Sequence, residues 1–266
     1  MDSPLLADQR RSAIRDEVVR TGAARVTDLV AMLGVSEMTV RRDITALAEQ
    51  GLVTRVHGGA VAPEGSAAEP AFTEKALRAG AQKTAIADAV AALVTPGTSL
   101  GLTAGTTTAA VASALTRLPH LSSLSVLTNS PPAAEILFAH PQRPAVVVTG
   151  GEPTPSAALV GPVAASVVTT FHLDLLVLGV SGMDPDAGLT SPTLAEAETL
   201  EAFLRAARRV VVAADSSKWG TAALRTIARW DVVDVLVTDD GLPPEALEHL
   251  RDVVDVVLAT TPEGSR

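Results

Sequence analysis

The chain has 266 residues and a formal net charge of −9 at neutral pH, and 47% of its residues are hydrophobic. This length suits a small domain joined to a medium-sized one, and the apolar fraction is too high for a disordered chain. The absence of cysteine excludes disulfide bonds, a thiol nucleophile and thiolate metal sites. The amino-terminal residues lack the apolar run of a signal peptide, and no apolar stretch reaches the ~18 residues of a membrane span. We therefore expect a cytoplasmic protein with no membrane partner.

Charge is distributed unevenly along the chain. Residues 1–60 contain eight arginines and eight acidic residues, so the whole net charge of −9 lies in residues 61–266. This asymmetry predicts two domains with different partners. A segment with no net charge does not by itself indicate a nucleic-acid surface. Whether residues 1–60 bind nucleic acid has to be judged from the placement of their arginines.

Three short helical patterns cover residues 7–50. The first ends at Gly22, and the second, VTDLVAMLG, is expected to begin with Thr27 as its cap and to end at Gly34. Ser36 is a good N-cap for the third pattern. Two short helices joined by a tight turn that contains glycine are typical of a helix-turn-helix motif.

The third helix, SEMTVRRD and onward, has a core face and an arginine-bearing face. At ~100° per residue, Val40, Ile44 and Leu47 share the core face. Arginine can pair with guanine or with phosphate, and the first turn of a recognition helix is where base edges and phosphates are met. We predict DNA contacts from Ser36, Met38, Thr39, Arg41, Arg42 and Thr45.

The next segment, LVTRVHGGAV, alternates apolar and polar residues around a glycine pair. It predicts a small β-ribbon, or wing, that exposes Arg55 and His57 as further DNA contacts. The alternative is that Glu37 and Arg41 form an ordinary surface pair and that the arginines are only solvated. The turn, the cap and the ribbon together favour a winged helix-turn-helix.

Residues 26–60 resemble, without gaps, the amino-terminal domain of the DeoR family of bacterial transcriptional regulators. The similarity lies in the recognition helix VSEMTVRRDI and in the wing RVHGGA. It implies sequence-specific binding to double-stranded operator DNA, usually as a repressor, with Arg41 and Arg42 as the main contacts. We assign residues 1–60 to a winged helix-turn-helix DNA-binding domain.

The remainder of the chain is predicted to be a linker and an α/β domain. Residues 61–71 are rich in Ala, Pro, Gly and Ser, as expected of a linker, and residues 72–260 alternate helical patterns with apolar strands. The expected helices are KTAIADAVAALV, TTTAAVASAL, PPAAEILFA, GPVAASVVTTF and LAEAETLEAFLRAA, and the expected strands are SLGLT, SVLT, PAVVVTGG, DLLVLGV, RVVVAAD and DVLVTD. Continuous Val/Leu runs between helices predict a Rossmann-like parallel sheet covered on both faces.

Several of these strands end in residues suited to an anionic ligand, which such sheets bind beyond the carboxyl ends of their strands. Backbone N–H groups, hydroxyls and the helix dipole at GTTT would favour phosphate. The P-loop and GxGxxG patterns are missing, so we propose no dinucleotide. Each strand end alone is equally explained as a turn, a cap or a solvated loop, and their convergence favours a pocket. The candidates are Gly105, Thr106, Thr107, Thr108, Asn129, Gly150, Gly151, Asp184, Gly188, Asp215 and Lys218.

Residues 72–240 also resemble the carboxyl-terminal sensor domain of the DeoR family, which is similar in fold to ribose-5-phosphate isomerase. The resemblance is carried by the GTTT loop, Thr128-Asn129, Gly150-Gly151, Gly161, the GxxGxD loop and DxSK. It implies a phosphorylated sugar or related metabolite as effector, with its phosphate on Gly105–Thr108 and Lys218 and its hydroxyls near Asn129 and Asp184. The family commonly has Asp or Ser where this chain has Thr103, so we expect Thr103 to alter which sugar hydroxyls are recognised.

Two other functions compete with a ligand-controlled repressor. A phosphosugar isomerase with an appended DNA-binding module would need a general base, and Asp184 or Glu196 could be nominated, although no motif demands that role. A non-specific architectural protein would be strongly basic, unlike this chain. The histidines show no metal spacing, so we expect neither a metal nor a cofactor: they are His57, His120, His140, His172 and His249. Winged-helix proteins usually bind paired half-sites, so we expect a homo-oligomer.

Overall fold

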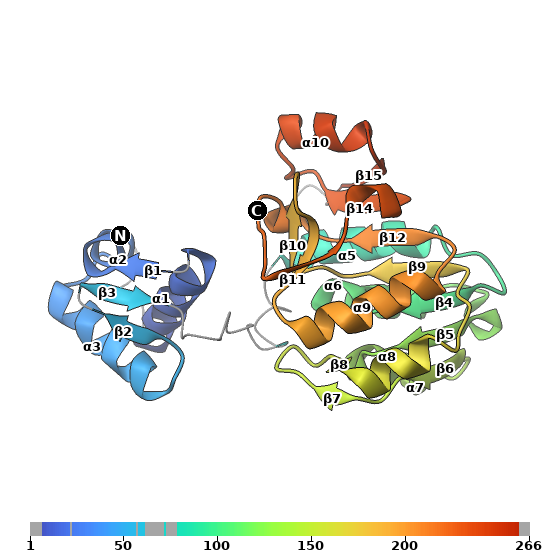
Figure 1. Cartoon of the computed structure of the whole chain (residues 1–266), viewed down its shortest axis with the longest axis horizontal. Helices are drawn as coiled ribbons and strands as arrows, with labels where there is room; N and C mark the ends of the chain where they lie inside the picture. Colours follow the sequence, from blue (N-terminus) through green and yellow to red (C-terminus); the bar gives the residue numbers. More distant parts are fainter. Residues whose placement is uncertain (1–6, 22, 57, 62–71, 73–78, 261–266) are drawn as a thin grey trace. The chain divides into compact units, whose positions relative to one another are not determined.

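The computed structural model describes residues 7–21, 23–56, 58–61, 72 and 79–260 (Figure 1). The chain divides into two compact units, residues 1–69 and 70–266.

The first unit is a winged helix-turn-helix, as the sequence predicts. Its elements are α1 (Ala7–Thr21), β1 (Ala23–Arg25), α2 (Val26–Leu33), α3 (Glu37–Glu49), β2 (Thr54–Val56) and β3 (Gly59–Val61). The strands form an antiparallel sheet in the order β1-β3-β2. A single apolar cluster holds the helices to this sheet, with Ile14, Leu29 and Ile44 almost completely buried at its centre. Strand β1 was not anticipated.

Three details of the sequence prediction need correction or lie outside the described residues. Thr27 is not the cap of α2, because the chain runs as strand β1 to Arg25 and the helix begins at once with Val26. Val61 belongs to β3, so the wing continues one residue into the predicted linker. Gly22, His57 and residues 62–71 lie outside the described part of the chain.

The second unit is built on a parallel sheet of seven strands. They are β4 (Ser99–Leu102), β5 (Ser125–Thr128), β6 (Ala145–Val148), β9 (Leu175–Leu178), β12 (Val210–Ala213), β14 (Val235–Asp239) and β15 (Asp255–Ala259). Their order is β15-β14-β12-β9-β4-β5-β6, and every neighbouring pair is parallel. The order reverses between β4 and β9, so the crevice where such sheets bind ligands is expected at the carboxyl ends of these two strands.

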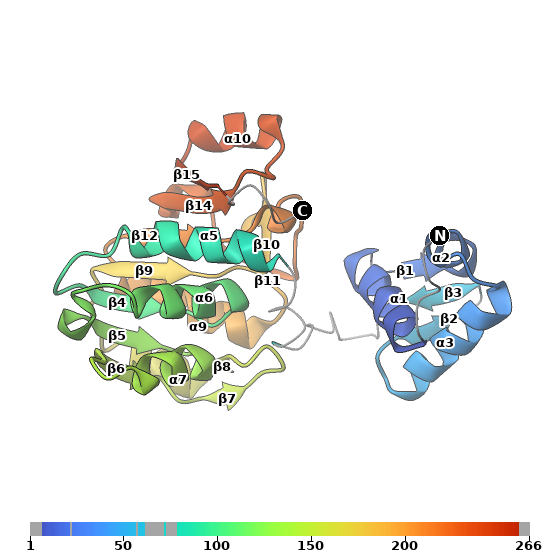
Figure 2. The same cartoon turned by 180° about the vertical axis from the view of Figure 1, so that it is seen from behind.

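Helices cover both faces of this sheet, as continuous apolar strands require. The helices α5 (Gly80–Ala91), α6 (Thr106–Leu115) and α7 (Pro131–Ala139) lie on one face, which comes forward in Figure 2. The helices α8 (Pro162–Val168) and α9 (Leu194–Ala206) lie on the other, which faces the viewer in Figure 1. One apolar cluster fills each of the two interfaces between helices and sheet. These elements confirm the predicted α/β architecture.

Smaller elements that the sequence patterns did not reveal surround the carboxyl edge. They are the hairpin β7 (Glu152–Pro153) and β8 (Leu159–Val160), the antiparallel sheet β10 (Gly182–Asp184), β11 (Gly188–Ser191) and β13 (Arg225–Ala228), and the helix α10 (Pro244–Arg251). A single-turn helix, η2 (Ser216–Lys218), follows β12.

Candidate DNA-binding face and effector site

The turn between α2 and α3 has the geometry that its sequence predicts. Gly34 ends α2 in the left-handed conformation, with φ of 64°, which glycine adopts without steric cost. Ser36 Oγ then accepts a hydrogen bond from the backbone N–H of Thr39 at 3.3 Å and caps α3. The first turn of α3 is therefore fixed by its own residues.

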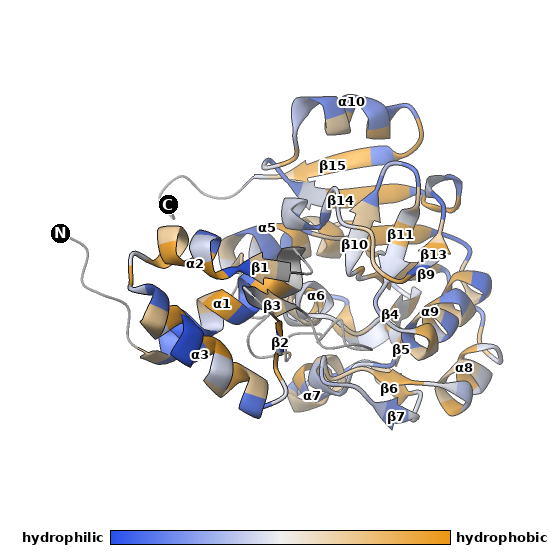
Figure 3. Cartoon of the chain, turned by 60° about the vertical axis from the view of Figure 1, so that its left-hand side comes forward, coloured by the Kyte–Doolittle hydropathy of each residue, from blue (hydrophilic) through white to orange (hydrophobic). Residues whose placement is uncertain are grey.

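The face of α3 that points away from the core carries the predicted DNA contacts. Val40, Ile44 and Leu47 are buried, whereas Met38 is 81% exposed and Arg42 is also exposed. Figure 3 shows the resulting change between hydrophilic and hydrophobic segments along this helix. Arg42 makes no hydrogen bond or ion pair with another residue of the described part of the chain.

Arg41 does form the pair with Glu37 that the alternative interpretation anticipates. Its Nε and a terminal nitrogen donate to Glu37 Oε1 at 2.8 and 2.6 Å. Both side chains are about half exposed, so the pair contributes only ~0.3–0.5 kcal/mol to stability. The bond restrains the guanidinium on the surface of α3 and leaves its other terminal nitrogen unused by Glu37.

The wing is linked to the recognition helix through Thr45. The Thr45 hydroxyl donates to the backbone carbonyl of Arg41 at 2.9 Å and accepts from the Arg55 guanidinium at 3.4 Å. Arg55 is exposed on β2, so the wing places another cation beside the outward face of α3.

The structure also reveals a role for Asp43, the acidic residue that follows the two arginines. Asp43 is 6% exposed and accepts from Arg10 Nε at 3.0 Å, which ties α3 to α1. Sequence reasoning missed this pair. An acidic residue three positions after Val40, at the edge of the apolar stripe, was the available signal.

In the sensor unit, Thr103 and Asn129 join three neighbouring strand ends. The Thr103 hydroxyl at the end of β4 accepts from the Gly179 N–H, after β9, at 2.9 Å. Asn129 Oδ1, after β5, accepts from the Ala104 N–H at 2.8 Å, and its Nδ2 donates to the Leu159 carbonyl at 3.0 Å. Both side chains are almost fully buried. They hold the three strand ends together; any contact with a ligand stays a prediction.

The GTTT segment opens α6 at this same point. Gly105 is the N-cap residue with φ of 147°, and its carbonyl accepts from the Thr108 hydroxyl at 3.0 Å. Thr107 and Thr108 are buried, while Thr106 is partly exposed. Because the first backbone N–H groups of a helix have no intrahelical acceptor, this turn offers donors and a positive dipole end to an anion.

Gly151, Gly188 and Asp184 have clear structural functions. At Gly151 a Cβ atom would lie 2.6 Å from the Val160 carbonyl oxygen, and at Gly188 it would lie 2.4 Å from that of Ala228. Asp184 Oδ1 accepts from the backbone N–H groups of Asp186 and Ala187 and closes the β10–β11 turn. Gly150 precedes Gly151 after β6 with φ of 69°.

Asp215 and Lys218 lie on the loop after β12. Asp215 is buried and its Oδ1 accepts from the Ser217 N–H at 3.2 Å, which caps η2 and fixes the loop that carries Lys218. Trp219 follows directly, and its ring centroid lies 6.1 Å from that of Trp230. The two tryptophans, the only ones in the chain, therefore adjoin a predicted effector contact.

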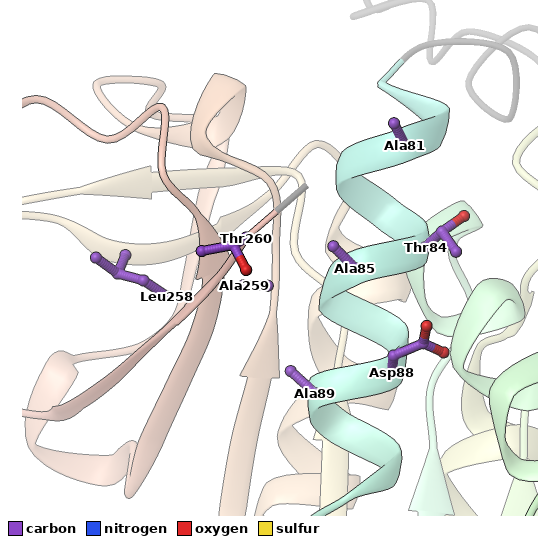
Figure 4. Close-up of a pocket in the computed structure, with 8 residues that line it drawn as sticks. All are labelled: Ala81, Thr84, Ala85, Asp88, Ala89, Leu258, Ala259 and Thr260. Atoms are coloured by element: carbon purple, nitrogen blue, oxygen red, sulfur yellow. The ribbon is translucent and has the colours of Figure 1, made fainter. Parts of the chain in front are cut away.

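Two open grooves flank α5. The larger, of about 500 Å³, runs between α5 and the end of β15 (Figure 4). Alanines and Leu258 form most of it, and its one charged residue, Asp88, is paired with Arg117, so it lacks a cation for phosphate. The second, of about 460 Å³, lies towards α6 and α7 and includes Thr106, Glu135 and the buried Lys83. Lys83 was not among the predicted site residues. It is distant from the GTTT turn in the sequence, and only the fold brings it to the same groove as Thr106.

Family models match both units. A DeoR-like helix-turn-helix domain matches residues 10–65, and a DeoR carboxyl-terminal sensor domain matches residues 78–240. The chain belongs to the DeoR family. It is accordingly a DNA-binding transcriptional regulator and not an enzyme.

Curated relatives share this organisation along nearly their whole length. The HTH-type transcriptional repressor CsqR of Escherichia coli is 35% identical over 96% of both chains. The glycerol-3-phosphate regulon repressor of Escherichia coli is 34% identical over 92% of this chain and 95% of its own. The HTH-type transcriptional regulator GlpR of Haloferax volcanii is 33% identical over 93% and 95%.

Solved structures align with part of the chain only. Ribose 5-phosphate isomerase A from Neisseria gonorrhoeae matches 52% of this chain and 53% of its own, at 15% identity and a TM-score of 0.37. Within the described ranges, no helix is long and apolar enough to cross a membrane. No group of three or more metal-binding side chains is found among those same residues.

Proposed function

We propose that this regulator represses an operon of carbohydrate metabolism and that a phosphorylated sugar controls it. The observation that carries the proposal is the amino terminus of α6 at the point where the strand order reverses, with the buried Lys83 in the adjoining groove. The glycerol-3-phosphate regulon repressor, named for a small phosphorylated polyol, supports the same ligand class. No cofactor is needed.

The phosphate would bind to the first turn of α6, Gly105–Thr108, with charge supplied by Lys218 and Lys83. Thr106 is the accessible hydroxyl of that turn. The sugar hydroxyls would meet the strand ends around Asn129 and Asp184. Both side-chain polar atoms of Asn129 hold backbone groups, whereas Asp184 uses only Oδ1 in the hydrogen bonds described above. Thr103 would act indirectly: its hydroxyl accepts the hydrogen bond from the Gly179 N–H and so holds the segment after β9 beside the end of β4.

On the DNA side, Arg41, Arg42 and Arg55 would contact the operator, together with the polar first turn of α3. Winged-helix modules commonly bind paired half-sites, so we infer a homo-oligomer with the sensor unit as its main interface. Because its target is DNA, the protein would act in the bacterial cytoplasm.

The testing experiment is fluorescence anisotropy on DNA from upstream of the protein's own gene, at one fixed salt concentration, with and without a panel of phosphorylated sugars. We expect specific binding that one sugar phosphate shifts. Arg42→Ala should weaken operator binding by ~1–3 kcal/mol for a base contact, or lower the salt dependence by about one unit for a phosphate contact.

Two sensor variants complete the test. Lys218→Ala should abolish the response to the sugar phosphate and leave operator affinity intact. Arg117→Ala, two residues beyond the carboxyl end of α6, should change neither. A normal response of Lys218→Ala would place the phosphate elsewhere. Absence of specific binding to this DNA would mean that the wrong operator was chosen. If selection from random duplexes also yielded no specific sequence, the repressor function itself would be contradicted.

A further inference from the structure

Met38 is the most exposed large hydrophobic residue among those described, with 81% of its surface accessible. It occupies the second position of α3, immediately after Glu37. A side chain so exposed contributes nothing to the core, and burying a methionine is worth ~1.5–3 kcal/mol, so the folded unit gains no stability from having it there. Single exposed apolar residues are common on protein surfaces, so the position of Met38 on α3 has to carry the argument.

The helical geometry places Met38 at the centre of the outward face. At ~100° per residue, Met38, Arg42 and Thr45 fall within about 60° of one another. The buried residues Val40 and Leu47 lie on the opposite side. Met38 is therefore directed towards whatever the outward face of α3 meets, one turn closer to the amino terminus than Arg42.

The chemistry of the methionine side chain argues against a phosphate contact at Met38. Glu37 adds an acidic group beside it, and that carboxylate is held by Arg41 at 2.6 Å. Phosphate contacts call for donors, which a thioether lacks. At base edges in the major groove, the apolar group is the C5 methyl of thymine, and apolar side chains of recognition helices contact it.

We propose that Met38 determines sequence specificity by packing against the C5 methyl group of a thymine in each operator half-site. The proposal rests on the DNA-binding function and predicts that one position of each half-site is a thymine. Methionine suits the role because its unbranched, polarizable side chain adapts to a small apolar partner.

Replacing thymine by uracil tests this directly, because uracil pairs identically and lacks only the methyl group. The operator is first selected from random duplexes with the full-length protein. Each thymine is then exchanged for uracil, one position at a time, and affinity is measured by anisotropy at fixed salt. For the wild type we expect one position per half-site to lose affinity about fourfold, which corresponds to ~0.8 kcal/mol per buried methyl group.

Met38→Ala should bind the thymine and uracil versions of that position within twofold of each other. Met32→Ala is the matched control: this methionine is also exposed, at 47%, but lies on α2, so its variant should keep the full uracil effect. The inference is overturned if no thymine is sensitive to the exchange, or if Met38→Ala keeps the sensitivity. Failure to select any sequence would instead contradict the DNA-binding function.

Discussion

Asp43 and Arg10 form the ion pair that fixes the orientation of α3 on α1, at 3.0 Å, with side chains 9% and 16% exposed. Removing one partner of a fully buried pair costs ~3–5 kcal/mol. Because Arg10 keeps some access to water, we expect Asp43→Ala to cost about 2–3 kcal/mol of stability in the DNA-binding unit. Glu37→Ala removes an exposed pair on the same helix and should cost less than about 0.5 kcal/mol.

Urea unfolding of the full chain can check this difference with two signals. The first 71 residues contain no aromatic side chain, so tryptophan fluorescence reports on the sensor unit alone, whereas far-ultraviolet circular dichroism reports on both units. Asp43→Ala should lower the midpoint of the dichroism transition and leave the fluorescence transition unchanged. Equal effects of the two substitutions would show that the Arg10–Asp43 pair is not structurally important.

Asp174 gives the sensor unit one pH-dependent contribution to its stability. Hydrogen bonds from the Ser99 hydroxyl and N–H, and then the charge of Arg208, lower the pKa of Asp174 below its usual 3.8, although partial burial opposes them. A group whose pKa is lower in the folded state stabilises the fold above its unfolded pKa. That contribution is lost as the pH falls through the folded value.

Asp174→Asn should therefore be less stable than the wild type at neutral pH, and the difference should shrink below about pH 4. Unfolding free energies from urea titrations between pH 3 and pH 7, followed by tryptophan fluorescence, measure it. A difference that stays constant across this range would mean that the substitution acts by changing packing and not through ionisation.

The wing depends on the close approach of β3 to β1 at Gly59. A Cβ atom there would lie 2.2 Å from the Ala24 carbonyl oxygen, which is a backbone atom and cannot rotate away. Gly59→Ala should force the two strands apart, at a cost of ~1–3 kcal/mol as for other overpacked sites, and should weaken operator binding. Gly80→Ala is the control, because no atom lies within 4 Å of its Cβ position and its φ is not positive.

Anisotropy on the operator and a sugar-phosphate titration together measure the effect of Gly59→Ala. Loss of DNA affinity with an unchanged effector affinity would confirm that the wing acts locally. If the variant bound operator like the wild type, the wing would not contribute to the DNA-binding face.

Most elements with long apolar or helical patterns were predictable from the sequence, whereas the short antiparallel elements, the helix α10 and the last parallel strand β15 were not. The expected helix TTTAAVASAL coincides with α6, which begins directly after Gly105. The expected strand SVLT coincides with β5, whose Val126 and Leu127 are buried. Strand β1 has only three residues, and its pairing with β3 links positions 38 residues apart, at Ala23 and Val61. Such a strand is specified by tertiary contacts, which a local pattern does not contain.

Candidate site residues divide in the same way. Ser36 and Arg42 follow from a local motif, and the structure places both as expected. Lys83 lies on a helix 23 residues before Thr106, and only the packing of α5 on α6 brings the two to one groove. Asn129 and Asp184 looked like ligand contacts because they are polar, yet their hydrogen bonds to backbone groups are also what the fold requires at those turns.

At the scale of the whole molecule, regulation requires that the effector and the DNA bind to the same chain with coupled free energies. The sequence separates the two functions: the DNA-binding unit holds the arginine-bearing helix, and the acidic unit holds both tryptophans and the turn that we propose to bind phosphate. Trp219 follows Lys218 directly, so intrinsic fluorescence is expected to change on effector binding without any label.

We predict that saturating operator DNA changes the effector affinity by the same factor by which saturating effector changes the operator affinity. Linkage demands this equality, and coupling factors of ~5–150 are typical. The effector affinity comes from tryptophan fluorescence with and without operator, and the operator affinity from anisotropy with and without effector. A factor of one in both titrations would mean that the sensor unit binds its ligand without controlling the DNA-binding unit. Arg42→Ala should weaken the operator and leave the effector affinity of the DNA-free protein unchanged, because the two units carry separate sites.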